Sequence, residues 1–255
     1  MASLITSGRV SSAPASVYYL PDYITREEEQ LLVDKVLTAP RPKWVHLKNR
    51  RKTYTHATRF KDSKDESGIV NEKGMIAEPL PTWLSDLFPR FQESRVFDGL
   101  DATHPLPNHC LVNEYLAGQG IMPHKDGPAY LPTVATVSLS SHCVLEFYRV
   151  PDENQDHDHE KGETAERRLE PEFSLLIQPR SLLVLKEDVY NKYMHGIREV
   201  TSDDLRQGNI LNLAEALPEG LQESDPPQLE RSTRISLTFR IVQKTLSAQR
   251  IFLRR

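Results

Sequence analysis

Residues 111–148, which read LVNEYLAGQGIMPHKDGPAYLPTVATVSLSSHCVLEFY, decide the fold and contain the first functional residues. Residues 133–141 and 144–148 show the alternation of short strands, and His142 lies in the predicted turn between them. His124 and Asp126 form an H-x-D pair upstream of these strands. Alternate residues of an extended strand point to one face, so this imidazole and this carboxylate can approach the same ion.

A third ligand must come from elsewhere in the chain, and His195 in the segment YMHGI is the best candidate. Two histidines and one carboxylate on one face of an octahedron leave three positions open, which suits Fe(II) that binds a chelating co-substrate and dioxygen. Structural zinc is usually enclosed by four protein ligands instead. In a chain with 9 His and 36 acidic residues an H-x-D pair also arises by chance, so the interpretation depends on further residues.

Residues 233–242, TRISLTFRIV, supply those further residues. In a strand, Arg234, Ser236, Thr238 and Arg240 share one face, and the apolar residues between them line the other. The arginine fork matches a carboxylate and stays charged, and a nearby hydroxyl can donate to the same group. The alternative is an ordinary half-buried strand with solvated arginines. Together with the predicted iron ligands, the pattern favours a socket for a small dicarboxylate.

These motifs, N-x-Y, H-x-D, a distal histidine and R-x-S-x-T-x-R, resemble the AlkB family of Fe(II)- and 2-oxoglutarate-dependent dioxygenases. Residues 120–148 and the segment LVLKEDVYNKYMHGI are most similar to the branch called the sixth AlkB homologue. The resemblance covers most of residues 17–242. It implies that His124, Asp126 and His195 bind iron as the catalytic centre. It also implies that 2-oxoglutarate is bound by five residues: Asn113, Tyr115, Arg234, Ser236 and Arg240.

The resemblance implies a fold as well, and the residues independently predict the same one. Short alternating strands, turn signals and two N-terminal helices are typical of a mainly β domain with flanking helices. Its core would be a double-stranded β-helix, or jelly roll. The first helix should begin after Thr25, which forms a capping box with Glu28. The iron site should lie between the two sheets, near one end of the barrel.

Oxidative dealkylation of N-methylated bases in DNA or RNA is the expected reaction, with Fe(II) as cofactor and 2-oxoglutarate and O2 as co-substrates. The base would be presented in a single strand or flipped out of a duplex. Two alternatives remain open: hydroxylation or demethylation of a protein side chain, and a nucleic-acid-binding protein with an idle iron site. Repair of DNA or RNA in the cytoplasm and nucleus is the corresponding expectation.

A basic segment precedes the catalytic motifs. Residues 41–64 contain nine Lys or Arg and a single acid, Asp62, with aromatic residues interleaved. Basic groups follow phosphates and aromatic rings stack on unpaired bases, so residues 41–78 are a candidate substrate lid. A solvated basic loop is the alternative. The lid residues we single out are Trp44, Arg50, Arg51, Lys52 and Tyr54.

The 255 residues fit a single dioxygenase domain at 17–255, after a disordered tail at 1–16. A net charge of -4 means that any nucleic-acid binding must be local. Two acidic segments, near 151–172 and 199–230, read as mobile or peripheral insertions. The first contains a D-H-D-H run at 156–159, for which a solvated loop is favoured over a metal site. Both cysteines are expected to be buried free thiols, and no apolar run approaches a membrane span.

Overall fold

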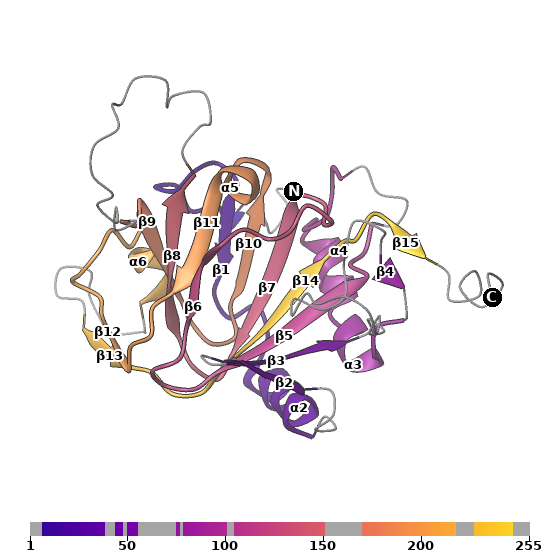
Figure 1. Cartoon of the computed structure of the whole chain (residues 1–255), viewed down its shortest axis with the longest axis horizontal. Helices are drawn as coiled ribbons and strands as arrows, with labels where there is room; N and C mark the ends of the chain where they lie inside the picture. Colours follow the sequence, from indigo (N-terminus) through magenta and orange to yellow (C-terminus); the bar gives the residue numbers. More distant parts are fainter. Residues whose placement is uncertain are drawn as a thin grey trace, which may run out of the picture.

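The computed structural model describes residues 7–38, 44–47, 50–55, 75–76, 79–100, 105–150, 170–217 and 227–246. Within these residues two antiparallel sheets form the body of the molecule (Figure 1). The larger sheet has the strand order β1-β10-β7-β14-β5-β3-β2, and the smaller has the order β6-β11-β8-β9. The mainly β fold with a jelly-roll core, predicted from the sequence, is confirmed.

The bounds of the elements are as follows. The larger sheet contains β1 (Val17–Leu20), β2 (Trp44–Leu47), β3 (Arg50–Thr55), β5 (His109–Tyr115), β7 (Thr133–Leu139), β10 (Leu182–Lys186) and β14 (Arg234–Arg240). The smaller sheet contains β6 (Ile121–His124), β8 (Cys143–Arg149), β9 (Phe173–Ile177) and β11 (Tyr193–Ile197). Two short pairs are β12 (Ser202–Asp204) with β13 (Gln228–Glu230), and β4 (Met75–Ile76) with β15 (Thr245–Leu246). The helices are α2 (Arg26–Leu37), α3 (Thr82–Ser85), α4 (Phe88–Glu93), α5 (Glu187–Lys192) and α6 (Leu213–Ala216).

The larger sheet separates two hydrophobic clusters because its side chains alternate between faces. On its outer face, Ile235, Leu237 and Phe239 of β14 pack in a cluster with residues of α2, α3 and α4 (Figure 1). On its inner face, Leu183 and Leu185 of β10 join a cluster with β8 and β9 of the smaller sheet. Helices α2, α3 and α4 therefore cover the outer face, and the space between the sheets is left for the site.

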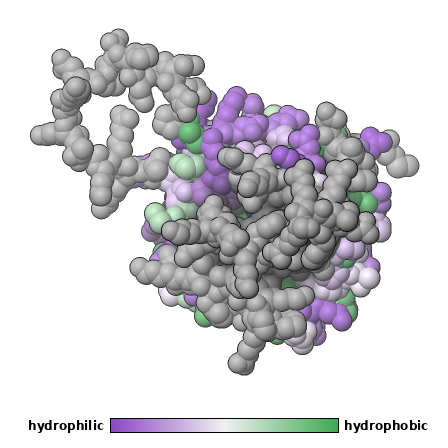
Figure 2. Space-filling model, turned by 45° about the vertical axis from the view of Figure 1, so that its right-hand side comes forward, coloured by the Kyte–Doolittle hydropathy of each residue, from purple (hydrophilic) through white to green (hydrophobic). Residues whose placement is uncertain are grey.

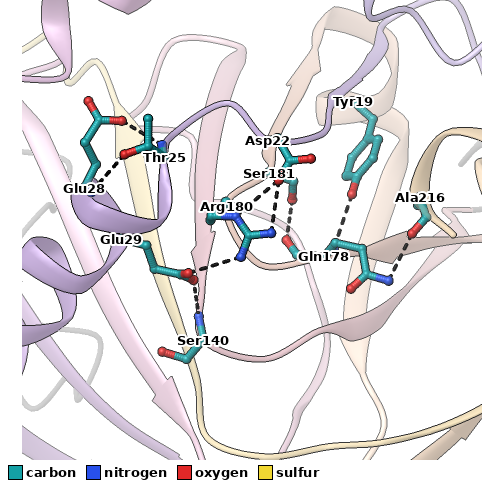
Figure 3. A network of polar contacts seen from close by, with 10 residues as sticks. All are labelled: Tyr19, Asp22, Thr25, Glu28, Glu29, Ser140, Gln178, Arg180, Ser181 and Ala216. Atoms are coloured by element: carbon teal, nitrogen blue, oxygen red, sulfur yellow. Dashed lines mark hydrogen bonds and ion pairs between the residues drawn. The ribbon is translucent and has the colours of Figure 1, made fainter. Parts of the chain in front are cut away.

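Helix α2 is fixed to the sheets by the polar network in Figure 3. Thr25 and Glu28 form the predicted capping box, so that prediction is confirmed. The Arg180 guanidinium, in the turn after β9, donates to Asp22 at 3.1 and 3.2 Å and to Glu29 at 3.3 Å. Glu29 also accepts the backbone N–H of Ser140, after β7, at 2.8 Å. One helix thus ties two turns of the sheets together.

The expectation of a disordered tail at 1–16 is wrong for residues 7–16. Val10 and Ala13 are buried in the cluster between the sheets, and Arg9 forms a β-bridge with Tyr18. Apolar side chains scattered among Ser, Ala and Pro gave too weak a pattern for this to be predicted. Residues 1–6 lie outside the described part of the chain.

The expectation of a mobile or peripheral insertion at 199–230 is also wrong for much of its described part. Arg231, directly after this segment, pairs in the protein interior with Asp203 at 2.6 and 2.7 Å. His142 Nε2 lies 3.2 Å from the same carboxylate, so this predicted turn residue supports the ion pair of Asp203 and Arg231. It does not line the site cavity. Asn212 exchanges hydrogen bonds of 2.8 Å with both backbone groups of Leu176 in β9. Residues 151–169 and 218–226, including the D-H-D-H run, lie outside the described residues.

The described surface is mainly polar. On the side shown in Figure 2, the described residues are mostly hydrophilic, with hydrophobic residues in small patches. Cys110 and Cys143 are buried free thiols, as predicted. In the described part of the chain, no helix combines the length and apolar character needed to cross a membrane.

Candidate active site

Two antiparallel strands of the smaller sheet bring the predicted histidines together. β6 pairs with β11 so that His124 and His195 are direct partners across the ladder, with ring centroids 4.5 Å apart. The close approach depends on Gly120, since a Cβ there would lie 2.2 Å from the Ile197 carbonyl oxygen. His124 Nδ1 lies 2.9 Å from the Met122 carbonyl oxygen, which orients its ring. Two imidazoles therefore face each other at the edge of the smaller sheet.

Asp126 lies just beyond the end of β6, not within the strand as the sequence suggested, and still reaches the same cavity. Its carboxylate is paired with the Arg240 guanidinium, which comes from the larger sheet. Burial works to raise the pKa of Asp126, but Arg240, His195 and His124 more than offset it, and the net pKa is lowered. The carboxylate is thus held as an anion between the two sheets.

The fit of a metal ion can be judged from these donors. Within the described residues, no group of three His, Cys, Asp or Glu side chains is already arranged as a metal-binding site. The Asp126 carboxylate has two oxygens. Arg240 donates to Oδ1, so Oδ2 remains to bind a metal ion. Burial and the neighbouring His124 lower the pKa of His195 to about 4, so its imidazole is neutral near pH 7. Two imidazoles and one carboxylate suit Fe(II).

A cavity of about 590 Å³ lies between the two sheets and contains all eight predicted iron and 2-oxoglutarate residues. The larger sheet contributes polar side chains from β5 and β14, and the smaller sheet contributes the histidines. The lining includes Asn113, Tyr115, His124, Asp126, His195, Arg234, Ser236 and Arg240. The predicted face of β14 is confirmed, because Thr238 also lines the cavity and the intervening apolar residues pack in the outer core.

Arg234 is a buried cation of this cavity and has no carboxylate partner among the described residues. Its side chain is buried, Nη2 donates to the Ser138 hydroxyl at 2.8 Å, and its guanidinium lies 5.7 Å from the centre of the Tyr115 ring. Among the described residues no carboxylate lies within ion-pair distance, and the buried Nε has no hydrogen-bond partner. The amide oxygen of Asn113 is likewise buried without a hydrogen bond. Such groups are costly to bury unless a ligand meets them.

Several residues around the cavity were missed by sequence reasoning. The Tyr130 ring lies under the Arg240 guanidinium at 4.9 Å and beside the His109 ring at 5.2 Å. The Tyr190 hydroxyl donates to the Gly127 carbonyl at 3.0 Å, which joins α5 to the loop after Asp126. A single tyrosine carries no local sequence signal of such a contact. Only the folded structure places Tyr130 beside Arg240 and Tyr190 beside Gly127.

The candidate lid is described in part. β2 and β3 pair with each other, and β3 extends the larger sheet at β5, the strand that carries Asn113 and Tyr115. Apart from 44–47, 50–55 and 75–76, residues 41–78 lie outside the described residues, and the lid stays a prediction. The lid candidates occupy these strands: Trp44 in β2, and Arg50, Arg51, Lys52 and Tyr54 in β3.

Comparison with known proteins agrees with this fold. The chain belongs to the 2OG-Fe(II) oxygenase superfamily, whose model matches residues 16–240. A Danio rerio protein named "Probable RNA/DNA demethylase ALKBH6" is 42% identical over 239 residues, covering 94% of this chain and 91% of that protein. The sequence-based assignment to the AlkB family, most similar to the sixth homologue, is thereby confirmed.

Two solved structures share the fold at low identity. "The structure of OsALKBH1" aligns with a TM-score of 0.53 at 14% identity, covering 89% of this chain and 96% of that one. A 2OG-Fe(II) oxygenase-family oxidoreductase from Burkholderia pseudomallei aligns with a TM-score of 0.50 at 12% identity, covering 95% and 94%. The protein is accordingly an oxidoreductase of the dioxygenase type, with Fe(II) as cofactor and 2-oxoglutarate and O2 as co-substrates.

Proposed function

We propose that this dioxygenase removes N-methyl groups from bases in DNA or RNA by oxidation. The observation that carries the oxidative chemistry of this proposal is the buried Arg234, which faces a cavity shared with His124 and His195 but has no carboxylate partner among the described residues. A buried cation of this kind is stabilised by an anionic ligand. A dicarboxylate reaching from Arg234 toward the histidines meets that need.

The roles of the remaining residues follow from their positions. His124, His195 and Asp126 would hold iron, and Arg240 would keep the Asp126 carboxylate ionised and aimed at the metal. When bound, iron and 2-oxoglutarate would activate O2 for the oxidation of a substrate C–H bond. Asn113 lines the same cavity and would orient the end of 2-oxoglutarate nearest the metal by donating from its amide Nδ2.

The far end of 2-oxoglutarate would be held by three groups. Arg234 would pair with the distal carboxylate through its planar fork. Tyr115 and Ser236 lie on the same wall of the cavity, and each has a hydroxyl that can donate to that carboxylate. Apolar side chains on both sheets, such as Leu145 and Leu185, would exclude water and strengthen these contacts.

Methylated nucleic acid is the substrate class we favour. The 42% identical relative is named a probable RNA/DNA demethylase, and the basic, aromatic composition of residues 41–64 suits an unpaired strand. Hydroxylation of an N-methyl carbon gives a hemiaminal, which collapses to formaldehyde and the unmethylated base. A methylated or hydroxylated protein side chain is the alternative substrate.

The test is a measurement of succinate and formaldehyde release with Fe(II), 2-oxoglutarate and O2. Purified protein is assayed with single-stranded DNA and RNA oligonucleotides, each carrying one kind of N-methyl base, and with unmethylated copies. The Asp126→Ala variant serves as the blank. Release of both products that depends on one methyl base supports the proposal and identifies the base. Succinate release that no oligonucleotide stimulates refutes a nucleic-acid substrate and directs attention to proteins.

A further inference from the structure

The orientation of Arg234 is set by a residue that does not line the cavity. Arg234 Nη2 donates to the Ser138 hydroxyl at 2.8 Å, and the Ser138 side chain is fully buried on the neighbouring strand β7. Ser138 is the direct partner of Ser236 across the β7–β14 ladder. Arg234 therefore reaches it along the diagonal on the same face of the sheet. The Ser138 hydroxyl is thus the hydrogen-bond partner of the Arg234 guanidinium among the described side chains.

Ser138 is itself held on both sides by the turn after β9. Its backbone N–H donates to the Ser181 carbonyl at 3.1 Å, and its carbonyl accepts the Arg180 N–H at 2.7 Å. The Arg180 side chain is in turn held by Asp22 and Glu29 (Figure 3). The chain of contacts thus runs from α2 through this turn to Ser138 and Arg234.

The backbone around this turn is strained. Asp22, Ser140 and Arg180 have positive φ angles of 45°, 71° and 64°, in the region that residues with a Cβ avoid. All three contribute to the network in Figure 3, in which Glu29 accepts hydrogen bonds from Ser140 and Arg180. Strain of this kind persists where the surrounding contacts impose it, and it clusters near sites that need fixed geometry.

We propose that Ser138 is a positioning residue for co-substrate binding, which fixes the guanidinium plane of Arg234 toward the distal carboxylate of 2-oxoglutarate. The inference rests on the proposed role of Arg234. An arginine side chain has many rotamers, and a bidentate contact needs one of them. Ser138 takes one N–H of Nη2, so the unpartnered Nε and the other N–H groups remain to meet the ligand. The Glu29–Arg180 contacts hold Ser138 in place.

The test compares two 2-oxo acids that differ at the far end. 2-Oxoglutarate has a distal carboxylate and 2-oxobutyrate lacks one, while both have the same metal-chelating end. Their affinities are measured by calorimetric titration of the Fe(II)-loaded protein without oxygen, so no turnover is needed. Ser138→Ala should weaken 2-oxoglutarate binding about tenfold or more, since a hydrogen bond to a charged group is lost. Binding of 2-oxobutyrate should not change.

Matched variants separate this role from a general loss of structure. Ser174→Ala removes an equally buried hydroxyl from β9 of the other sheet and should leave both affinities unchanged. Ser138→Thr keeps the hydroxyl and should restore the preference for the dicarboxylate. Equal weakening of both acids in Ser138→Ala, or no weakening of either, would overturn the inference.

Two further variants keep the outcomes distinct. If Ser138→Ala does not fold, Glu29→Gln decides, because it weakens the contact with Arg180 from outside the cavity. It should lower the ratio of the two affinities in the same direction, and an unchanged ratio would overturn the inference. Arg234→Ala tests the underlying assignment. If it binds 2-oxoglutarate like the wild type, the proposed function of Arg234 fails, whatever Ser138 does.

Discussion

Replacing Asp203 with alanine should destabilise the fold far more than loss of a surface acid would. The Asp203 and Arg231 side chains are 1% and 5% exposed, and two short hydrogen bonds join them. The variant leaves the buried Arg231 guanidinium with the Arg198 carbonyl, at 2.8 Å, as its one remaining described partner. Removing one member of a buried ion pair costs about 3–5 kcal/mol, because the other charge stays uncompensated.

For a domain of this size each kcal/mol lowers the melting temperature by about 2–4 °C, so the expected fall is roughly 6–20 °C. Differential scanning calorimetry and urea unfolding measure it directly. Asp204→Ala is the matched control: this neighbouring acid pairs with the exposed Arg206, and its loss should have a far smaller effect. The double variant Asp203→Leu/Arg231→Met should recover most of the stability, since it removes both charges.

The pH dependence gives a second readout of the same pair. Burial works to raise the pKa of Asp203, but the neighbouring His142 and the Arg231 guanidinium offset it and the net pKa is lowered. Its ionisation therefore adds stability that is complete above the unfolded value of about 3.9 and is lost as pH falls through the lowered folded value. Asp203→Asn should remove this contribution to the loss of stability at acid pH. If Asp203→Ala lowered the free energy of unfolding by less than about 1 kcal/mol, as for surface pairs, a stabilising buried ion pair of Asp203 and Arg231 would be refuted.

Three other predictions can be tested with the same protein. Thr25→Ala removes the capping box of α2 and should cost about 1 kcal/mol in urea unfolding. Burial, followed by the charge of Arg240, lowers the pKa of His109 to about 3, so the unfolded chain binds a proton there that the folded protein does not. Stability should therefore fall between about pH 6.5 and pH 3, and His109→Phe should flatten that fall in calorimetry. Charge reversal of Arg50, Arg51 and Lys52 should weaken single-stranded oligonucleotide binding and reduce its salt slope by about 0.7 per lost phosphate contact, whereas unchanged binding would refute the lid.

The parts predicted correctly from sequence are those in which spacing alone determines geometry. Alternation along β14 assigns Arg234 and Arg240 to the cavity face, and the capping box marks the start of α2. Both of these relations lie within a single element, so the period of that element is enough to predict them. His124 and Asp126 reach the same cavity as predicted, although Asp126 lies just beyond the end of β6.

The parts that were missed depend on contacts between distant segments. Ser138 is an unremarkable serine in a strand until the ladder register sets it across from Ser236. Asp203 appeared to belong to a solvated acidic insertion because net charge says nothing about where a partner lies. Its partner Arg231 is 28 residues away, and the burial of both is a property of the folded chain.

Three buried arginines between 231 and 240 show how pairing divides their tasks. Arg231 is neutralised by Asp203 and Arg240 by Asp126, which leaves Arg234 for an anion from outside the described chain. Arg234 and Arg240 face the same cavity but lie six residues apart, roughly 20 Å along an extended strand. Neither arginine side chain is long enough to reach across that distance to the position of the other. On the proposed function, Arg240 would therefore serve the metal end and Arg234 the far carboxylate, and a co-substrate with a single carboxylate would leave Arg234 without a counterion.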